Sequence, residues 1–219
     1  MNRKFLIILA SLGMPFLGFS MQLPTPKPLL TNNINGLSSK ALSTAIVSYL
    51  HAKKDGYVKK PIMLLVDFTK PSNQRRLYIL DMRHPFSPTA VFYGFVGQGI
   101  GSGKKIAKHF SNAFNSHMSS LGGFVTTNNP YSGRWGYSLR IKGIEAGINN
   151  NAYDRAVILH GDPQVNEKIA KEYGYVHPSW GCFSLNKKYS TKIINTVKGG
   201  SFIFAYAKQE SKDPYTHLV

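Results

Sequence analysis

The sequence predicts a single domain with a mainly β fold, an antiparallel sandwich or barrel with a few peripheral helices. Short runs rich in aliphatic and aromatic residues alternate with turn-rich stretches, which is typical of strands that share one core. The chain has 219 residues, enough for one domain with a real core and too few for two. The segments expected to be strands are 62–68, 76–82, 90–96, 138–144, 156–160 and 201–207.

Helical periodicity is confined to a few segments. Behind a cap at Ser38 or Ser39, apolar residues recur every three or four positions and stop by Gly56, which predicts an amphipathic helix. The other expected elements are two short helices, at 164–173 and 187–197, and two turn-rich loops, at 97–103 and 126–136.

The N-terminus has the layout of a secretory signal peptide. Arg3 and Lys4 precede an almost uncharged apolar run, and small residues precede Met21 at the two positions that a signal peptidase requires. The run is short and interrupted by glycine and proline, so it suits a membrane-spanning helix poorly, although an uncleaved anchor remains the alternative. The expected parts are a signal peptide (1–20), a flexible tether (21–36), a folded domain (37–207) and a C-terminal tail (208–219).

The chain is strongly basic, with a formal net charge of +17 spread along it as pairs of lysine and arginine. Such a surface favours polyanions, although most such pairs simply face solvent. The signal peptide predicts an exported protein, cut near Ser20 and Met21, that contacts the membrane only in transit; in a bacterium the destination is the periplasm or the exterior. The expected polyanions are therefore wall polymers, peptide carboxylates or lipid head groups, and not nucleic acid.

Cysteine usage is unusual for an exported chain, because Cys182 is the only cysteine. It cannot form a disulfide within the chain. Composition alone leaves three interpretations: a reactive thiol, an intermolecular bridge, or a small buried hydrophobic residue.

The glycine-rich segment 97–105 does not match a nucleotide-binding motif. A phosphate-binding loop needs a glycine where Gln98 stands and a serine or threonine where Lys105 stands. The dinucleotide fingerprint fails because Ser102 occupies the position of its third glycine. A tight loop after a strand is expected instead.

Metal binding has little support in the sequence. The seven histidines form no His-Glu-x-x-His motif, and a single cysteine cannot supply paired ligands. His160, Asp162 and His177 could meet around zinc, which keeps a metal site as an alternative. The expectation is that the protein uses neither a metal nor another cofactor.

The most informative feature combines His160 and Gly161, at the end of an expected strand, with the Ser-Trp-Gly-Cys segment 179–182, in which the cysteine follows His160 by 22 positions. A histidine held at a strand end can accept the thiol proton, and glycine before the cysteine lets backbone N–H groups approach an oxyanion. A thiolate–imidazolium pair can lower a cysteine pKa from about 8.5 to about 3.5–7.5. We therefore expect a reactive Cys182, although spacing alone also fits a core histidine and a buried cysteine.

From His160 to Cys182 the chain resembles the catalytic domain of L,D-transpeptidases, the YkuD-like family, whose signature is His-Gly followed by Ser or Thr, then His-Gly-Cys. Here Trp180 stands in place of the second histidine, and this Ser-Trp-Gly-Cys variant resembles the murein L,D-transpeptidase branch. The resemblance implies the β-sandwich or barrel of that family. It covers about 37–207, and the other segments that support it are 66–68, 76–81, 110–112, 119–122, 136–140, 150–155 and 198–201.

The resemblance implies a role for each residue of the motif. Cys182 is the expected nucleophile and His160 the general base and acid, with the Gly161 carbonyl orienting the imidazole. Backbone N–H groups near Gly181 and Cys182 are expected to hold the oxyanion. Ser179 is expected to support this loop by hydrogen bonding.

The sequence departs from the family pattern at four places. Trp180 is expected to form a wall of the pocket and to take no part in proton transfer. Pro178 and Gln98 stand where the family often has a basic residue and a histidine, and Ser184 replaces the arginine of a common Cys-x-Arg ending. Other cations must then bind substrate carboxylates, and the candidates are Arg155 and Arg134.

The resemblance implies acyl transfer in peptidoglycan. The cysteine attacks the third residue of a tetrapeptide stem, releases D-Ala, and passes the acyl group to an amine or to water. The implied partners are peptidoglycan stem peptides and, as further acceptors, wall-attached proteins. The alternative is a catalytically idle wall-binding or host-facing surface factor with the same fold. A papain-like protease is disfavoured because its nucleophile precedes its histidine in the chain.

Overall fold

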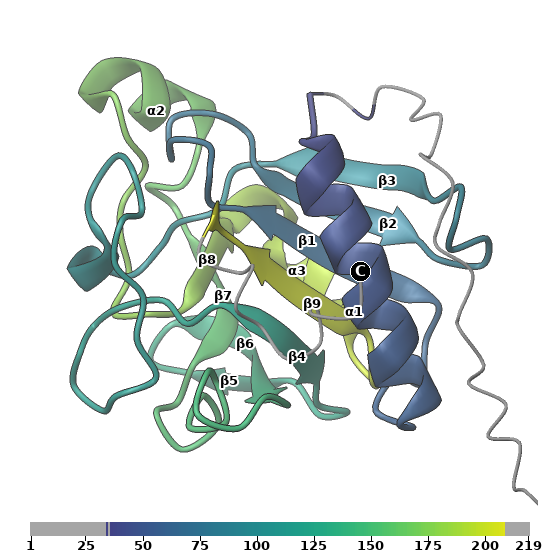
Figure 1. The fold of residues 1–219 in the computed structure, drawn as a ribbon. Coiled ribbons are helices and arrows are strands. Elements are labelled where there is room, and N and C mark those ends of the chain that lie inside the picture. Colours follow the sequence, from purple (N-terminus) through teal and green to yellow (C-terminus); the bar gives the residue numbers. More distant parts are fainter. Residues whose placement is uncertain (1–33, 35, 209–219) are drawn as a thin grey trace, which may run out of the picture.

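A computed structural model describes residues 34 and 36–208, whose arrangement is drawn in Figure 1. The predicted signal peptide (1–20), residues 21–33 and 35 of the predicted tether, and residues 209–219 of the predicted tail lie outside the described residues. Across the described ranges, no helix combines the length and the apolar character that a membrane span requires.

Nine strands form one sheet in the order β3-β2-β1-β9-β4-β6-β7-β8, with β5 paired to β6 at the side. In the described part of the chain, six of the eight strand pairs are antiparallel, and only β1–β9 and β7–β8 are parallel. The strands are β1 (Ile62–Asp67), β2 (Leu77–Asp81), β3 (Thr89–Gly94), β4 (Gly122–Thr126), β5 (Tyr131–Gly133), β6 (Gly136–Gly143), β7 (Ile158–Asp162), β8 (Phe183–Asn186) and β9 (Phe202–Tyr206).

The two ends of this sheet approach each other, which makes it nearly a closed barrel. An isolated bridge joins Val96, just after β3, to Leu185 in β8. Next to it, the Gly97 N–H donates to the Ser184 carbonyl at 2.9 Å. The prediction of a mainly β, barrel-like single domain with peripheral helices is therefore confirmed.

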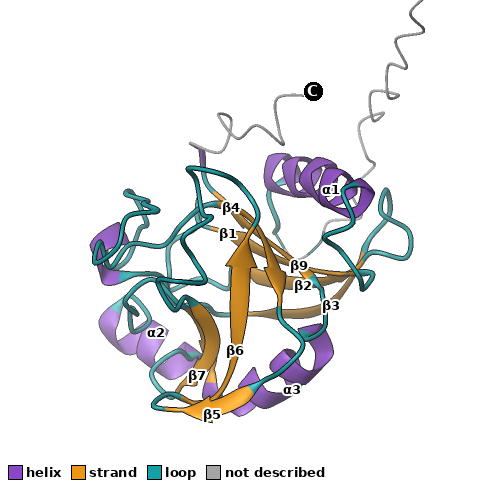
Figure 2. Ribbon diagram, turned by 90° about the horizontal axis from the view of Figure 1, so that it is seen from below, coloured by secondary structure: helices purple, strands orange, loops and turns teal. Residues whose placement is uncertain are grey.

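The helix α1 (Ser39–Lys54) covers the outer face of the sheet. The Ser38 hydroxyl accepts the Ala41 N–H at 3.3 Å, so Ser38 and not Ser39 is the cap. Buried side chains at helical spacing, from Ala41 to Tyr49, pack on β1 and β9. Figure 2 shows α1 and α3 on opposite sides of this part of the sheet.

Strands β1 and β9 are buried on both faces, which explains their unbroken apolar sequences. In β9, Phe202 and Phe204 belong to the core under α1, whereas Ile203 faces the barrel interior. The interior core also receives the apolar face of α3 (Lys187–Val197), including Ile194. This helix has the predicted bounds, because the Asn186 side chain caps it by accepting the Lys188 N–H at 2.9 Å.

Three expectations about element bounds need correction. The helix expected over 164–173 is α2 (Glu167–Tyr173), because Asn166 caps it by accepting the Ile169 N–H at 3.0 Å. The strand expected over 156–160 begins later, since Ala156 has a φ of +55°, outside the strand region. The loop expected over 126–136 contains β5.

Strands β4 and β8 were not expected from the sequence. Strand β4 begins with Gly122 and Gly123, and glycine weakens a strand pattern. A side chain at either position would collide with the buried carboxylate of Glu145, which accepts the Gly123 N–H. Strand β8 has only four residues, too few to establish a period of two in the sequence.

A buried arginine stabilises the seam where the sheet nearly closes. The Arg76 guanidinium is fully buried and donates to the Val96 carbonyl from Nε (3.3 Å) and Nη2 (3.0 Å). It also donates to the Lys70 carbonyl (3.0 Å) and to the Gln98 side-chain oxygen. Burial lowers the pKa of Arg76 to about 9, and the charge of Asp67 acts in the opposite direction. The group thus depends on these contacts to remain charged.

We expect Arg76→Lys to destabilise the fold by about 2–4 kcal/mol, because an ammonium cannot reproduce the forked contacts and leaves buried acceptors unsatisfied. The free energy of unfolding in urea measures this. The matched control is Arg75→Lys, whose side chain is 47% exposed and pairs with Glu167 at the surface, with an expected cost below about 1 kcal/mol. Equal costs for the two variants would contradict a special role for Arg76 at the seam.

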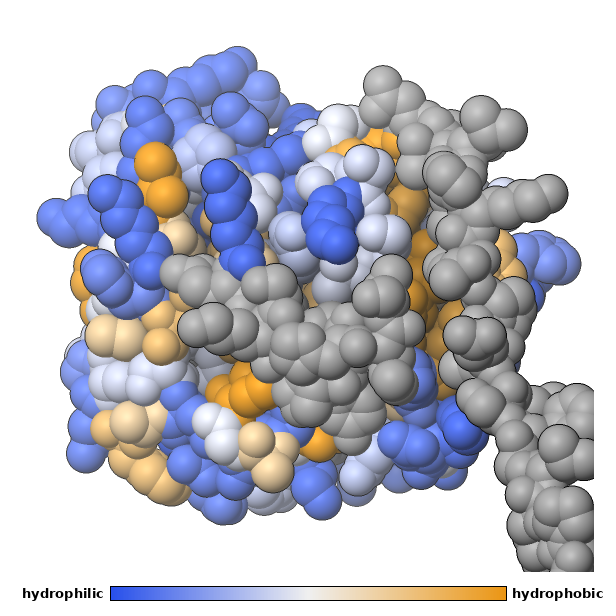
Figure 3. Space-filling view, viewed as in Figure 1, coloured by the Kyte–Doolittle hydropathy of each residue, from blue (hydrophilic) through white to orange (hydrophobic). Residues whose placement is uncertain are grey.

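The surface is largely hydrophilic. Figure 3 shows hydrophilic side chains over much of one face, with smaller hydrophobic areas between them. Among the exposed aromatic side chains are Trp135, 50% exposed, and Trp180, 70% exposed. Both belong to the cleft described next.

Candidate active site

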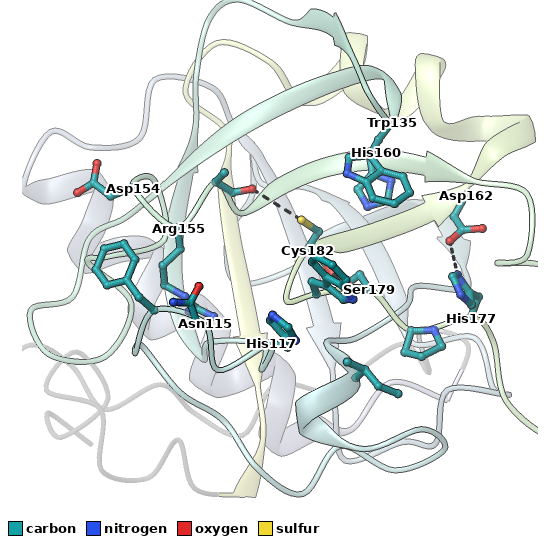
Figure 4. A pocket seen from close by; sticks show the side chains of 15 residues that line it. Asn115, His117, Trp135, Asp154, Arg155, His160, Asp162, His177, Ser179 and Cys182 are labelled. Carbon is teal, nitrogen blue, oxygen red and sulfur yellow. Dashed lines mark hydrogen bonds and ion pairs between the residues drawn. The ribbon is translucent and has the colours of Figure 1, made fainter.

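A cleft of about 610 Å³ brings together distant parts of the chain. Of the predicted site residues, it is lined by Cys182, His160, Ser179, Trp180 and Arg155. Figure 4 shows how the labelled side chains surround the cysteine sulfur. The other residues that line it are Ile100, Phe114, Asn115, His117, Trp135, Asp154, Ala156, Asp162, His177 and Pro178.

His160 is held firmly because it lies in the middle of β7. Its register partners are Ser138 on β6 and Ser184 on β8, so strands fix its backbone on both sides. The side chain is 3% exposed, and Nδ1 lies 3.2 Å from the Gly161 carbonyl. With Nδ1–H donating to that carbonyl, Nε2 is available as a proton acceptor.

Cys182 immediately precedes β8, on the same face of the sheet as His160. In the parallel pair β7–β8, His160 lies opposite Ser184. The same register places Cys182 opposite Ile158, so the cysteine is a diagonal neighbour of the histidine. The opposite face, with Leu159 and Phe183, is core. Alternation along the two strands therefore turns both reactive side chains toward the cleft.

The thiol and the imidazole are both favoured in their neutral forms. Burial raises the pKa of the Cys182 thiol, although a backbone hydrogen bond from Ile158 and the charge of Arg155 act in the opposite direction. Burial likewise lowers the pKa of His160, against the effect of the Gly161 carbonyl. In the described structure the thiol lies 3.8 Å from the Ala156 carbonyl, its hydrogen-bond acceptor. The expected lowered cysteine pKa is therefore wrong for this state.

We expect alkylation of Cys182 by iodoacetamide to be slower at neutral pH than that of a free cysteine, and to rise through the alkaline range. The reason is that only the thiolate reacts and burial raises the pKa of this thiol. Mass spectrometry gives the rate at each pH, with N-acetylcysteine as the reference. Rapid alkylation near pH 6 would instead mean that the thiolate–imidazolium pair forms in the free protein.

Ser179 organises the loop that presents the cysteine. Its hydroxyl donates to the Cys182 carbonyl at 2.7 Å and accepts the Gly181 N–H at 3.1 Å. Gly181 has a φ of +110°, and a side chain there would meet the Met118 carbonyl. Because the Gly181 N–H is engaged by Ser179, the Cys182 N–H is the better oxyanion donor of the two predicted groups.

The glycine-rich loop supports this cysteine loop. The Ser179 N–H donates to the Gln98 carbonyl at 2.8 Å, and the Ile100 N–H donates to the Ser179 carbonyl at 2.7 Å. Gly99 packs so closely on the loop at 116–119 that a side chain would lie 2.3 Å from the His117 carbonyl oxygen. These glycines are thus explained by close approach of backbones and not by a phosphate.

The two candidate substrate cations differ in placement. Arg155 lines the cleft, but its guanidinium donates to carbonyl and hydroxyl oxygens of the loop at 111–120, over distances of 2.6–3.2 Å. It thereby orders this wall and places positive charge near Cys182. Arg134 lies outside the cleft lining, 5.4 Å from the ring centre of Trp135.

Aromatic side chains form two walls of the cleft. Trp180 stacks on His117, with ring centres 4.7 Å apart and planes 6° from parallel. Trp135 lies against His160, with ring centres 5.4 Å apart. Trp180 is thus the wall that the motif predicted. Trp135 and His117 belong to loops far from the motif in sequence, so no local signal pointed to them.

Asp162 and His177, considered above only as zinc ligands, form a pair at one side of the cleft. The His177 Nδ1 lies 2.8 Å from the Asp162 carboxylate. Across the described residues, no three histidine, cysteine, aspartate or glutamate side chains converge as a metal site would require. The sequence signal for Asp162 was its place directly after the His-Gly dipeptide.

Ser184 explains one departure from the family pattern. Its side chain is fully buried and packs against Gly97. A Cβ added to Gly97 would lie only 2.2 Å from the Ser184 hydroxyl. An arginine in place of Ser184 has no room at this seam.

A thiol and an imidazole fixed by neighbouring strands in one open cleft are the residue set used by cysteine acyl-transfer enzymes. The family model of the L,D-transpeptidase catalytic domain matches residues 33–206, and the chain belongs to this family. Comparison with curated protein sequences gives no match.

Solved structures that resemble this chain have low identity to it. The helical cell shape determining protein Pgp2 from Campylobacter jejuni is 10% identical, with a TM-score of 0.44, over 77% of this chain and 56% of its own. An L,D-transpeptidase from Mycobacterium smegmatis is 12% identical, with a TM-score of 0.41, over 67% and 59%. One from Stackebrandtia nassauensis is 15% identical, with a TM-score of 0.40, over 68% and 57%. The chain thus spans 56–59% of the length of these proteins.

Proposed function

We propose that this protein is a peptidoglycan L,D-transpeptidase that uses Cys182 as its nucleophile and His160 as its general base and acid. The observation behind the proposal is that the only thiol of the chain shares one cleft with a strand-held imidazole, in a member of this family. Thiol and imidazole are the groups that acyl transfer through a thioester requires.

The reaction begins with both groups neutral. As the donor stem binds, His160 Nε2 takes the thiol proton and the sulfur attacks the carbonyl of the third residue, the L-centre of diaminopimelate. The oxygen of the tetrahedral intermediate accepts the Cys182 N–H. The amide C–N bond then breaks, His160 returns the proton to the leaving amine, and D-Ala departs. The acyl group remains on Cys182 as a thioester.

The thioester retains the bond energy needed for a new amide, so the exchange requires no ATP. An amine of another stem gives a crosslink between third residues, a lysine of a wall protein gives an attached protein, and water gives a trimmed tripeptide. The expected compartment is the periplasm or the exterior of a bacterial cell, which the pattern of residues 1–20 supports. The charge of +17 favours an anionic meshwork as the partner.

The test is incubation of the protein with a disaccharide tetrapeptide, followed by intact-mass spectrometry and chromatography of the products. We expect a protein adduct of the donor mass less D-Ala, together with free D-Ala and either dimers or tripeptides. Absence of adduct and of product, from folded protein whose thiol still alkylates, would reject the enzyme and favour a catalytically idle wall-binding factor.

A further inference from the structure

A second histidine in the cleft has its own carboxylate partner. His177 Nδ1–H donates to Asp162 Oδ2 at 2.8 Å, and Asp162 Oδ1 accepts the Gln164 N–H at 2.7 Å. The Asp162 side chain is 12% exposed, whereas that of His177 is 49% exposed. The carboxylate is thus fixed in the wall and holds an imidazole whose other nitrogen, Nε2, is free to meet a molecule in the cleft.

This pair lies beside the catalytic histidine. Figure 4 shows Asp162 and His177 on one side of Cys182 and Arg155 on the other. Both members of the pair influence the charge state of His160, Asp162 favouring and His177 opposing the imidazolium. The cleft is therefore lined by Arg155 and Asp154 on one side of Cys182 and by the carboxylate–imidazole pair on the other.

The second half of the proposed reaction removes two protons from the acceptor. Near neutral pH the acceptor amine is an ammonium ion, which must lose one proton before it can attack and a second one as the amide forms. After D-Ala leaves, His160 is neutral and can accept one proton. A second acceptor close to the thioester would take the other proton inside the cleft.

We propose that Asp162 and His177 form the site of the acceptor amine, with His177 as the base that converts the ammonium ion into a nucleophile. The inference rests on the proposed acyl transfer, and it assigns these residues to the second half of that reaction, the transfer of the acyl group to the acceptor. The carboxylate attracts the cationic acceptor to this wall.

The protons balance as follows. The ammonium ion gives its first proton to His177 Nε2, and Asp162 stabilises the imidazolium through its Nδ1–H bond. The free amine attacks the thioester carbonyl, forming the C–N bond. Collapse of the intermediate breaks the C–S bond, and the second proton passes through His160 to the Cys182 sulfur. His177 then loses its proton to solvent, leaving an amide and the resting thiol.

The experiment compares the wild type with His177→Gln and Asp162→Asn, using disaccharide tetrapeptide as donor and acceptor. Asparagine retains an oxygen for the Gln164 N–H, so that variant removes charge while keeping the loop contact. Intact mass gives the rate of acyl-enzyme formation, and chromatography gives the ratio of dimer to tripeptide. The matched control is His84→Gln, an exposed histidine of the turn after β2.

We expect the dimer-to-tripeptide ratio to fall about 10-fold or more in both variants. This fall should exceed any change in acylation that follows from the altered charge beside His160. With hydroxylamine as acceptor, which is mostly uncharged at neutral pH, the deficit should largely disappear. A merely structural role would lower acylation by a similar factor and would not depend on the charge of the acceptor.

Three outcomes would overturn the inference. Unchanged product ratios in the variants would refute the acceptor site while leaving the proposed acyl transfer intact. A wild type that forms acyl-enzyme but yields only tripeptide would do the same, because no amine is then accepted. Failure of the wild type to form any acyl-enzyme would reject both the proposed function and this site.

Discussion

Cys182→Ser is expected to lower the rate of D-Ala release from a tetrapeptide donor by at least about 10³-fold. A serine hydroxyl is a much weaker acid than a thiol, so His160 cannot generate an equivalent nucleophile from it. The serine also cannot store the acyl group as a thioester. Chromatography of released D-Ala measures the loss.

The fold should tolerate this change. In the described structure the sulfur forms hydrogen bonds with backbone groups, the Ala156 carbonyl at 3.8 Å and the backbone of Ile158. The thermal unfolding midpoint of Cys182→Ser should therefore stay within a few degrees of that of the wild type. Because the chain has a single cysteine, complete alkylation of the wild type should abolish activity to the same extent. D-Ala release at the wild-type rate by the serine variant would exclude Cys182 as the nucleophile.

His160→Gln is expected to reduce kcat/KM for acylation by about 10²–10⁴-fold, the range of general acid–base catalysis. The glutamine amide can fill the space beside Trp135 but cannot accept the thiol proton. Single-turnover measurement of adduct formation isolates this step. His84→Gln serves again as the matched control and should retain the wild-type rate.

The pH dependence provides a second test of the same residue. Burial lowers the pKa of His160, so the imidazole stays neutral and basic to a lower pH than an ordinary histidine. The acid limb of kcat/KM for acylation should therefore lie below about 6.5 in the wild type. In His160→Gln this limb should be lost. A wild-type limb well above 6.5 would contradict the lowered pKa.

These expectations describe a cysteine that is activated only when substrate binds. Both Cys182 and His160 are favoured as neutral groups, and the thiol bonds to a carbonyl outside the pair. In the proposed reaction, the proton moves to the imidazole as the donor stem binds. Such an arrangement limits oxidation of the lone thiol, because the thiolate is the species that oxidants attack.

Much of the fold could be predicted because its signals are local. Short runs rich in aliphatic and aromatic residues predicted β1, β2, β3, β6 and β9, and the amphipathic pattern after Ser38 predicted α1. The His-Gly dipeptide and the Ser-Trp-Gly-Cys segment identified four of the residues that line the cleft, His160, Ser179, Trp180 and Cys182. The His-Gly dipeptide was expected at a strand end and the Ser-Trp-Gly-Cys segment in a glycine-containing loop. Both features restrict the backbone, so these short motifs alone were enough to assign the side chains to a site.

Other elements depend on contacts between distant residues. Strand β4 begins with two glycines and becomes a strand because β6 and β9 supply hydrogen-bond partners on both sides. Strand β8 is short and is held by its parallel partner β7. Neither segment has an alternating pattern long enough to predict it, since pairing and not side-chain period determines these strands.

The sequence by itself determined a mainly β domain, its long helix, and the cysteine and histidine that any acyl-transfer chemistry must use. Only the tertiary structure decided the pKa values and the hydrogen-bond partners of the groups in the cleft. It raised the pKa of the Cys182 thiol by burial, committed Arg155 to the loop at 111–120, and joined Asp162 to His177, 15 positions away. The physical reason is that residue type and spacing are local properties, whereas desolvation and hydrogen-bond partners depend on strand register and on loops that meet only in the folded chain.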